Sequence, residues 1–217
     1  MMDFEAARIK MVDNQIRTTD VTSYSVLNAF HAVPREAFVP DRLKPLAYID
    51  DDIEIARGRF LMEASPLAKL LQLCEITRDD LVLEIGSGTG YVSALLSLTA
   101  GSVVSLESDE TLAAEAATTL AALGYDNVAV VSGDLEKGYA AEAPYDLIVV
   151  NGAVEEVPAA LLEQLRDGGR LAAIVGYGNA AQARLILKDQ GRVSESAHFN
   201  ASVRPLPGFR REREFVF

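Results

Sequence analysis

The sequence predicts an α/β fold in which a doubly wound, mostly parallel sheet follows an N-terminal helical extension. Short apolar runs alternate with helix-like segments from residue 81 onward, a pattern typical of parallel strands joined by right-handed crossovers. A glycine-rich turn links the first apolar run to the next helix. The chain before residue 79 instead carries amphipathic helical patterns interrupted by prolines. We therefore expect a cap segment over residues 1–78 and a nucleotide-binding core over residues 79–217.

The expected elements follow from hydrophobic spacing and helix-capping residues. In the cap segment we expect helices over 3–18, 22–30 and 65–76, the last capped by Ser65, and an extended or looped stretch over 47–62. In the core we expect strands at 81–85, 102–107, 128–132, 145–150 and 170–175, and helices at 91–99, 109–123 and 158–165. Segments 183–188 and 194–203 would add terminal strands, one of them antiparallel.

Composition narrows the function classes. The chain has 217 residues, 49% of them apolar, enough for one buried α/β domain with an elaboration. Its 32 acidic residues against 20 basic ones give a net charge of -12, which argues against nucleic acid as a partner. The N-terminus lacks the pattern of a signal peptide, and no apolar run is long enough to span a membrane. We expect a cytoplasmic monomer without a membrane partner or a metal site, in which the single Cys74 is a buried apolar residue.

The turn after residue 85 has the features of a ligand site. Gly86, Gly88 and Gly90 permit positive φ and leave bare backbone for a ligand. The dinucleotide fingerprint G-x-G-x-x-G would need its third glycine at Tyr91. Glu84 stands just before the turn, where a carboxylate would repel a pyrophosphate but attract an ammonium group. These features favour S-adenosylmethionine, a sulfonium with an amino-acid tail and no phosphate, whose demethylated product is S-adenosylhomocysteine.

Acidic side chains also end the next two strands. Glu107 ends strand 102–107, 21 residues after Gly86, where a carboxylate can accept both ribose hydroxyls. Asp134 follows strand 128–132 and can accept from an adenine amino group, or alternatively can cap the next segment as a turn residue. The remaining residues expected to contact the cofactor lie at the same strand ends: Ser87, Thr89, Tyr91, Ser108, Leu135 and Asn151.

With these residues in place, the chain resembles the class I methyltransferases, whose fold is Rossmann-like. More specifically, it resembles the protein-L-isoaspartate (D-aspartate) O-methyltransferases. Residues 11–16 match the family pattern M-V-x-x-Q-L, residues 33–40 match V-P-R-x-x-F-V-P, residues 47–50 match A-Y-x-D, and residues 157–171 match V-P-x-x-L-x-x-Q-L-x-x-G-G-R-L. The resemblance implies methylation of a carboxylate, in isoaspartyl or D-aspartyl residues of damaged proteins, by S-adenosylmethionine.

The chain departs from the family at one motif. The pattern L-P-I-G-x-G-Q-T-I-S, whose serine is assigned to the active site, reads I-E-I-A-R-G-R-F-L-M over residues 53–62. Arg59, Phe60 and Met62 thus replace glutamine, threonine and serine, so no catalytic residue is assigned. We expect these three residues and Arg204 to line the acceptor side. Arg59 could clamp a carboxylate in bidentate fashion, or it could face outward in a salt bridge.

The sequence offers few catalytic bases. A carboxylate acceptor is ionised at pH 7 and needs none, and we expect His31 and His198 to be structural. The three acids at 50–52 and the basic cluster at 210–213 are expected at solvated positions. Two alternatives stay open, namely a methyltransferase with another small or carboxylate acceptor and an adenosylmethionine-binding protein without transferase activity.

Overall fold

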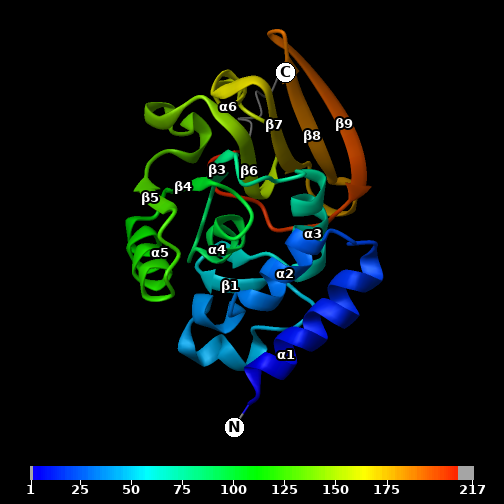
Figure 1. The fold of residues 1–217 in the computed structure, drawn as a ribbon, viewed down its shortest axis with the longest axis vertical. Coiled ribbons are helices and arrows are strands. Elements are labelled where there is room, and N and C mark those ends of the chain that lie inside the picture. The colour runs from blue at the N-terminus through cyan, green and yellow to red at the C-terminus, as the bar shows by residue number, and fades with distance from the viewer. Residues whose placement is uncertain (1, 210–217) are drawn as a thin grey trace, which may run out of the picture.

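A computed structural model describes residues 2–209, so the basic cluster at 210–213 lies outside the described residues. Its main sheet has the strand order β5-β4-β3-β6-β7-β8-β9 (Figure 1). β5, β4, β3, β6 and β7 run parallel to one another, whereas the pairs β7–β8 and β8–β9 are antiparallel. The predicted mostly parallel α/β fold is confirmed. The strands are β3 (Leu81–Ile85), β4 (Ser102–Glu107), β5 (Val128–Ser132), β6 (Tyr145–Val154), β7 (Leu165–Val175), β8 (Gln182–Asp189) and β9 (Arg192–Asn200).

The two terminal pairings, β7–β8 and β8–β9, are both antiparallel, so β8 alone runs against the parallel strands and β9 runs in their direction again, as predicted. Only residues 176–181 connect β7 to β8, and such a short link cannot make the crossover that a parallel pair needs. Gln190 and Gly191 then join β8 to β9 with φ values of 48° and 72°. Two successive positive φ angles are typical of the tight turns that close β-hairpins.

The core helices are α4 (Tyr91–Ser97), α5 (Glu110–Ala122) and α6 (Ala159–Glu163). The last is shorter than the predicted 158–165, because β7 already begins at residue 165. Figure 1 shows the N-terminal helices, drawn in blue, gathered on one side of the sheet, and the orange β8–β9 hairpin projecting at its far edge.

The N-terminal segment combines helices with one small hairpin. Its helices are α1 (Phe4–Met11), which continues through helical turns to Thr19, α2 (Tyr24–Ala32) and α3 (Ala64–Leu73), with 3-10 turns at Arg35–Phe38 and Asp41–Leu46. The stretch expected to be extended or looped contains an antiparallel pair, β1 (Ile53–Ala56) and β2 (Arg59–Leu61). Ser65 does not cap α3, because the N-cap position is Glu63 and the Ser65 hydroxyl lies 3.1 Å from that of Thr19.

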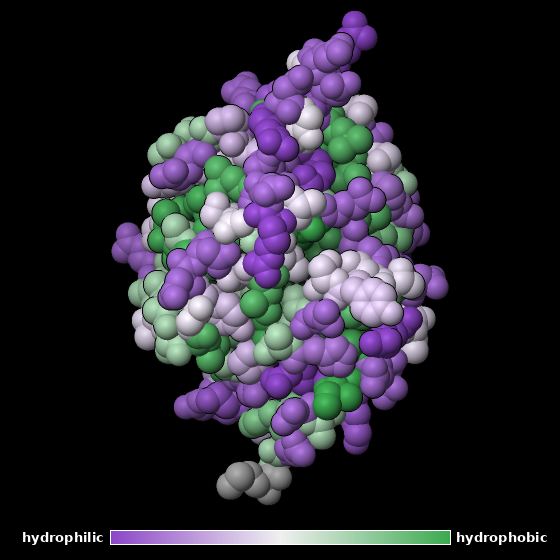
Figure 2. Space-filling view, in the orientation of Figure 1, coloured by the Kyte–Doolittle hydropathy of each residue, from purple (hydrophilic) through white to green (hydrophobic). Residues whose placement is uncertain are grey.

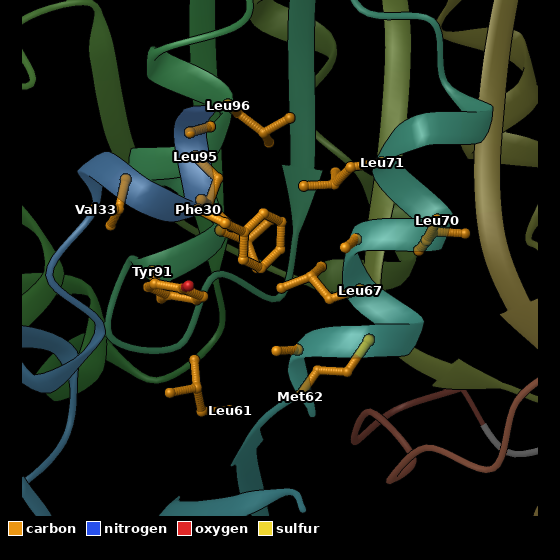
Figure 3. Packing of buried hydrophobic residues seen from close by; sticks show 14 of the residues in the cluster. Phe30, Val33, Leu61, Met62, Leu67, Leu70, Leu71, Tyr91, Leu95 and Leu96 are labelled. Atoms are coloured by element: carbon orange, nitrogen blue, oxygen red, sulfur yellow. The ribbon is translucent and has the colours of Figure 1, made fainter. Parts of the chain in front are cut away.

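Two apolar layers enclose the sheet. Figure 3 shows Phe30, Leu67 and Tyr91 meeting in the layer that joins the N-terminal helices to α4 and the sheet. The second layer includes Leu83 on β3 and Leu206 in the C-terminal segment. The N-terminal segment and the sheet therefore share one continuous core.

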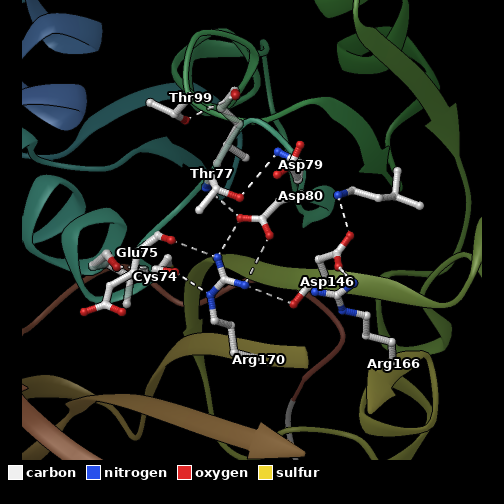
Figure 4. A network of polar contacts seen from close by, with 12 residues as sticks. Cys74, Glu75, Thr77, Asp79, Asp80, Thr99, Asp146, Arg166 and Arg170 are labelled. Atoms are coloured by element: carbon white, nitrogen blue, oxygen red, sulfur yellow. Dashed lines mark hydrogen bonds and ion pairs between the residues drawn. The ribbon is translucent and has the colours of Figure 1, made fainter. Parts of the chain in front are cut away.

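Cys74 is fully buried at the end of α3, as predicted. Burial raises the pKa of its thiol to about 12, so at neutral pH it is not a nucleophile. Figure 4 shows the polar network around it, at the edge of the sheet where β3 begins. Arg170 donates to Asp80 (2.7 Å) and to the backbone carbonyls of Glu75 (3.2 Å) and Cys74. This network joins α3 to β7 at the end of the sheet opposite the glycine turn.

In the face that Figure 2 presents, hydrophilic residues cover most of the surface and apolar residues form small separate patches. Within residues 2–209, none of the helices combines the length and the apolar character needed to cross a membrane.

Candidate active site

The candidate site lies at the carboxyl ends of β3, β4 and β6. The strand order changes direction at β3, because β4 lies on one side of it and β6 on the other. Ligands of doubly wound sheets bind at such a switch point. Here the turn between β3 and α4 crosses the sheet edge, with φ values of 83°, 57° and 95° at Gly86, Gly88 and Gly90. All three lie in the left-handed region that favours glycine.

Side chains of this protein already lie close to the turn. A Cβ at Gly86 would come 2.7 Å from Leu206 Cδ2, and one at Gly88 would come 2.9 Å from Ile55 Cδ1. Leu206 also lies against Gly152 in β6, where an added Cβ would be 2.6 Å from the Leu206 Cγ. The glycines thus allow other atoms to lie close to the backbone of the turn, as predicted. Some of those atoms, however, belong to side chains of this protein.

Glu84 is fully buried at the end of β3. Its carboxylate accepts from the Ser93 hydroxyl (2.5 Å) and from the Asn151 side-chain amide (3.1 Å). The pKa of Glu84 is raised to about 7, chiefly by burial and to a smaller extent by the nearby charge of Glu107. The two hydrogen bonds oppose this rise. Glu84 is therefore close to half protonated at neutral pH.

Glu107 is fully buried at the end of β4, and its main partner is Arg59 from β2. The two groups form a bidentate pair, with Arg59 Nη2 2.6 Å from Glu107 Oε2 and Nη1 in contact with Oε1. The same carboxylate accepts the backbone N–H groups of Gly88 (2.7 Å), Ser108 (2.8 Å) and Asp109 (3.0 Å). Arg59 thus neither faces outward nor has its fork free for an acceptor, because the carboxylate that it clamps is Glu107.

Two buried polar atoms at this edge have no hydrogen-bond partner within residues 2–209: Ser87 Oγ and Asn151 Oδ1. Buried polar atoms are normally paired, so a ligand with complementary groups would satisfy them. Together with the turn and the two carboxylates, they fit a nucleoside that carries an amino-acid tail. The side chains of Arg59 and Leu206, however, occupy part of the space beside the turn and the two carboxylates.

The other predicted cofactor residues have varied surroundings. The Tyr91 side chain points into the core, where its ring lies 6.2 Å from that of Phe30. Thr89 donates to the Phe38 carbonyl at 2.5 Å. Asp134 pairs with Lys137 at the surface, and its side chain makes no capping hydrogen bond. Of the remaining two, Ser108 is exposed and Leu135 is buried.

The four residues expected on the acceptor side do come together. They line one cavity with Asp52, Asn151 and Gly152, and the volume of that cavity is about 10 Å³, roughly the room of one water molecule. The Arg204 guanidinium lies 5.2 Å from the Phe60 ring centre, and its Nε lies 3.9 Å from Asp52 Oδ2. Met62 lines this cavity and also packs in the core (Figure 3). The residues that meet here are Arg59, Phe60, Met62 and Arg204.

Asp52 is a site residue that sequence reasoning missed. The run 50–52 was expected to be solvated, yet the Asp52 side chain is only 9% exposed and accepts from the Glu63 backbone at 2.8 Å. Burial raises its pKa. No sequence pattern distinguishes Asp52 from its exposed neighbours Asp50 and Asp51, because the fold of the later C-terminal segment is what covers it.

A larger hollow of about 780 Å³ borders the site. It lies between residues 37–41, the end of β1 and α5, and it reaches Thr89 and Asp109. Glu84 and Glu107 do not line it, so the hollow adjoins the carboxylates without containing them.

The parallel sheet, its switch point, the glycine turn and the two strand-end carboxylates define a class of protein. They are the features of a class I methyltransferase with a Rossmann-like fold.

The family follows from comparison with known proteins. Residues 6–208 match the family model described as protein-L-isoaspartate(D-aspartate) O-methyltransferase, and the chain belongs to this family. A protein-L-isoaspartate O-methyltransferase of Koribacter versatilis is 38% identical over 205 residues, which cover 94% of this chain and 92% of the relative.

Two solved structures share the fold. One, a protein-L-isoaspartate O-methyltransferase, superposes with a TM-score of 0.78 at 26% identity, over 93% of this chain and 66% of its own. The other, from Plasmodium falciparum and described as such an enzyme in complex with S-adenosyl-L-homocysteine, has a TM-score of 0.79 at 18% identity and covers 95% and 99% of the two chains. The predicted fold, the methyltransferase class and S-adenosylmethionine as methyl donor are confirmed as those of the family. The roles of individual site residues stay predictions.

Proposed function

We propose that this protein transfers a methyl group from S-adenosylmethionine to the free carboxylate of isoaspartyl or D-aspartyl residues in damaged proteins. The observation that carries the proposal is the composition of the acceptor cavity. Two guanidinium groups, those of Arg59 and Arg204, line it beside the glycine turn. Because Glu107 occupies the Arg59 fork, Arg204 is the cation of this pair that can face an anionic acceptor. His31 on α2 and His198 on β9 do not line the cavity.

A carboxylate acceptor fits a site with no dedicated base. It is ionised at neutral pH and attacks without losing a proton. The cofactor, when bound, supplies the methyl group on a sulfonium. The residues of this chain then have to hold the acceptor in line and exclude water, and the apolar side chains of Phe60 and Leu206, which line the cavity, suit the exclusion of water.

The partners and setting are proposed on the same basis. The acceptor is a peptide or protein, with a small carboxylate as the alternative. We propose a monomeric cytoplasmic protein, and the net charge of -12 supports the absence of nucleic-acid binding. Residues 1–78 act as the cap over the cofactor, and residues 79–217 as the core that binds it.

The test is methyl transfer to a synthetic peptide. With labelled S-adenosylmethionine, an isoaspartyl peptide should gain label that is lost on mild base treatment, since methyl esters are base-labile. The same peptide with an ordinary aspartyl residue is the control and should gain none. Label on neither peptide, at enzyme concentrations near those of the substrate, would contradict the proposal.

A second acceptor class is favoured by the burial of Asp52 in the cavity. An acceptor that must lose a proton needs a general base, and Asp52 is the carboxylate that lines this space. For such an acceptor, Asp52→Asn should lower turnover by about a hundredfold or more, whereas transfer to a carboxylate should change little. Base-stable label on lysate components would indicate this class.

A protein that binds the cofactor without transferring methyl is the third candidate, favoured by Met62 at the family's serine position. Calorimetric binding of S-adenosylhomocysteine, together with no label on any peptide or lysate component, would support it.

A further inference from the structure

The carboxylate of Glu107 has no acceptor position left for a ribose. Its Oε2 accepts from Gly88 N and Arg59 Nη2, and its Oε1 accepts from Ser108 N, Asp109 N and Arg59 Nη1, with a longer hydrogen bond from the Ser108 hydroxyl at 3.3 Å. Each carboxylate oxygen offers about two lone-pair positions. Two ribose hydroxyls can therefore bind this group only if an existing donor leaves.

Among these donors, Arg59 is the side chain whose departure would free a position on both carboxylate oxygens, since the Ser108 hydroxyl contacts only Oε1, at 3.3 Å. The three N–H groups belong to the backbone of the glycine turn and of the chain just after β4, so moving them would distort the edge of the sheet. Arg59 reaches Glu107 through a flexible side chain from β2 and contributes two of the bonds. Two hydroxyl donors could replace its two N–H donors one for one.

The pair is enclosed, which makes the exchange costly. The side chains of Arg59 and Glu107 are 8% and 0% exposed, so little water screens their attraction. The hairpin that carries Arg59 also lays Ile55 over Gly88. Arg59 is thus the polar contact that holds this hairpin on the glycine turn.

We propose that Arg59 competes with the ribose of S-adenosylmethionine for the carboxylate of Glu107 and thereby sets the affinity for the cofactor. The inference rests on the proposed function, since it assumes that the nucleoside binds at this turn. When one arrangement blocks a site, the apparent affinity equals the intrinsic affinity multiplied by the fraction of molecules in the open arrangement. Removing the competing side chain raises the open fraction towards one, so a variant without Arg59 binds more tightly than the wild type.

Calorimetric titration with S-adenosylhomocysteine tests the proposal on three proteins. Arg59→Gln removes the charge and the fork, and it places at this position the glutamine of the family pattern. Arg57→Gln is the matched control, because Arg57 is exposed on the same hairpin and the change in charge is identical. Arg59→Gln should bind about tenfold more tightly or better, and Arg57→Gln should match the wild type.

The outcomes separate the two proposals. If the wild type binds and Arg59→Gln binds equally or less tightly, the competition is overturned while the proposed function stands. If none of the three proteins binds, the proposed function fails and the inference fails with it. Binding by Arg59→Gln alone would be the strongest support.

A second variant covers the case in which Arg59→Gln does not fold, as judged by far-UV circular dichroism. Arg59→Lys keeps the positive charge but replaces the planar fork by a single ammonium. It leaves one edge of Glu107 open, so its affinity should exceed that of the wild type severalfold. An affinity equal to that of the wild type would contradict the proposal.

Discussion

Glu84 and Glu107 are both fully buried, but only Glu107 has a cation as its direct partner. Glu84 has two neutral donors, from Ser93 and Asn151, and an unpaired acceptor nearby, Asn151 Oδ1. The geometry therefore agrees with the pKa of about 7 that burial produces.

Stability should consequently depend on pH through Glu84. Its pKa rises from 4.5 to about 7 on folding, so the folded state holds the proton more tightly. The associated stability is present below pH 4.5 and is lost as the pH rises through about 7. Glu84→Gln imitates the protonated form, and it should exceed the wild type by roughly 3 kcal/mol in unfolding free energy at pH 8.

Urea unfolding at pH 5 and pH 8 measures this difference. Near pH 5 the difference should shrink to about 0.8 kcal/mol, because Glu84 is then protonated in the folded state and the remainder comes from its ionisation in the unfolded chain. All other groups titrate alike in both proteins, so their contributions cancel in the difference between the two unfolding free energies. A difference that is the same at both pH values would mean that Glu84 does not titrate in this range.

Sequence reasoning identified both carboxylates but not their partners. Glu84 was recognisable because it stands just before the glycine turn, and Glu107 because it ends the next apolar strand. The Arg59–Glu107 pair joins residues 48 positions apart, and no local pattern reports a contact between distant segments. Tyr91 was expected beside the cofactor because of its place in the turn, but helical geometry directs its side chain into the core.

At the scale of elements, Arg35 fastens the segment that carries Arg59. It is fully buried, and it donates to the carbonyls of Ala47 (2.7 Å) and Met62 (2.8 Å), at the two ends of the stretch containing β1 and β2. Its guanidinium also lies 4.8 Å from the centre of the Tyr91 ring. One side chain thus joins both ends of this stretch to the core.

Arg35→Met should lower the unfolding free energy by about 3 kcal/mol, since it leaves two buried carbonyls without their charged donor. Urea denaturation followed by far-UV circular dichroism measures the loss. Arg42→Met is the control, because Arg42 is exposed on the neighbouring turn, and it should change stability by less than about 0.5 kcal/mol. Equal effects of the two substitutions would contradict the role assigned to Arg35.

Elements with strong apolar runs were predicted closely, and short ones were not. Strands 81–85, 102–107 and 128–132 match the structure because polar or turn residues bound each run. The hairpin of β1 and β2 was missed, since strands of four and three residues offer too few positions to show an alternation. β6 runs past its predicted end through the buried residues 151–154, where burial outweighs weak local preference. β7 begins five residues before its predicted start, although residues 166–168 are exposed.

At the scale of the whole molecule, one core joins the cap segment to the sheet. Phe30 and Leu67 from the N-terminal helices pack in the same cluster as Tyr91 and Val103 from the core. Neither part can bury its apolar surface without the other, so the chain should unfold in a single transition. The division at residue 78, expected from the change in sequence pattern, does not interrupt this core.

Two probes can check this cooperativity. Far-UV circular dichroism reports helices and strands throughout, whereas near-UV circular dichroism reports the packing of tyrosines such as Tyr91. Their urea transitions should coincide. Two separated transitions would show that the cap segment and the sheet unfold independently.

The central claim is that the glycine turn and its strand-end carboxylates hold an adenosyl nucleoside. A crystal structure with S-adenosylhomocysteine tests it most directly. We expect the nucleoside beside residues 86–90, its ribose hydroxyls on the Glu107 carboxylate and the Arg59 side chain moved away. A nucleoside bound elsewhere, with the Arg59–Glu107 pair intact, would contradict the account.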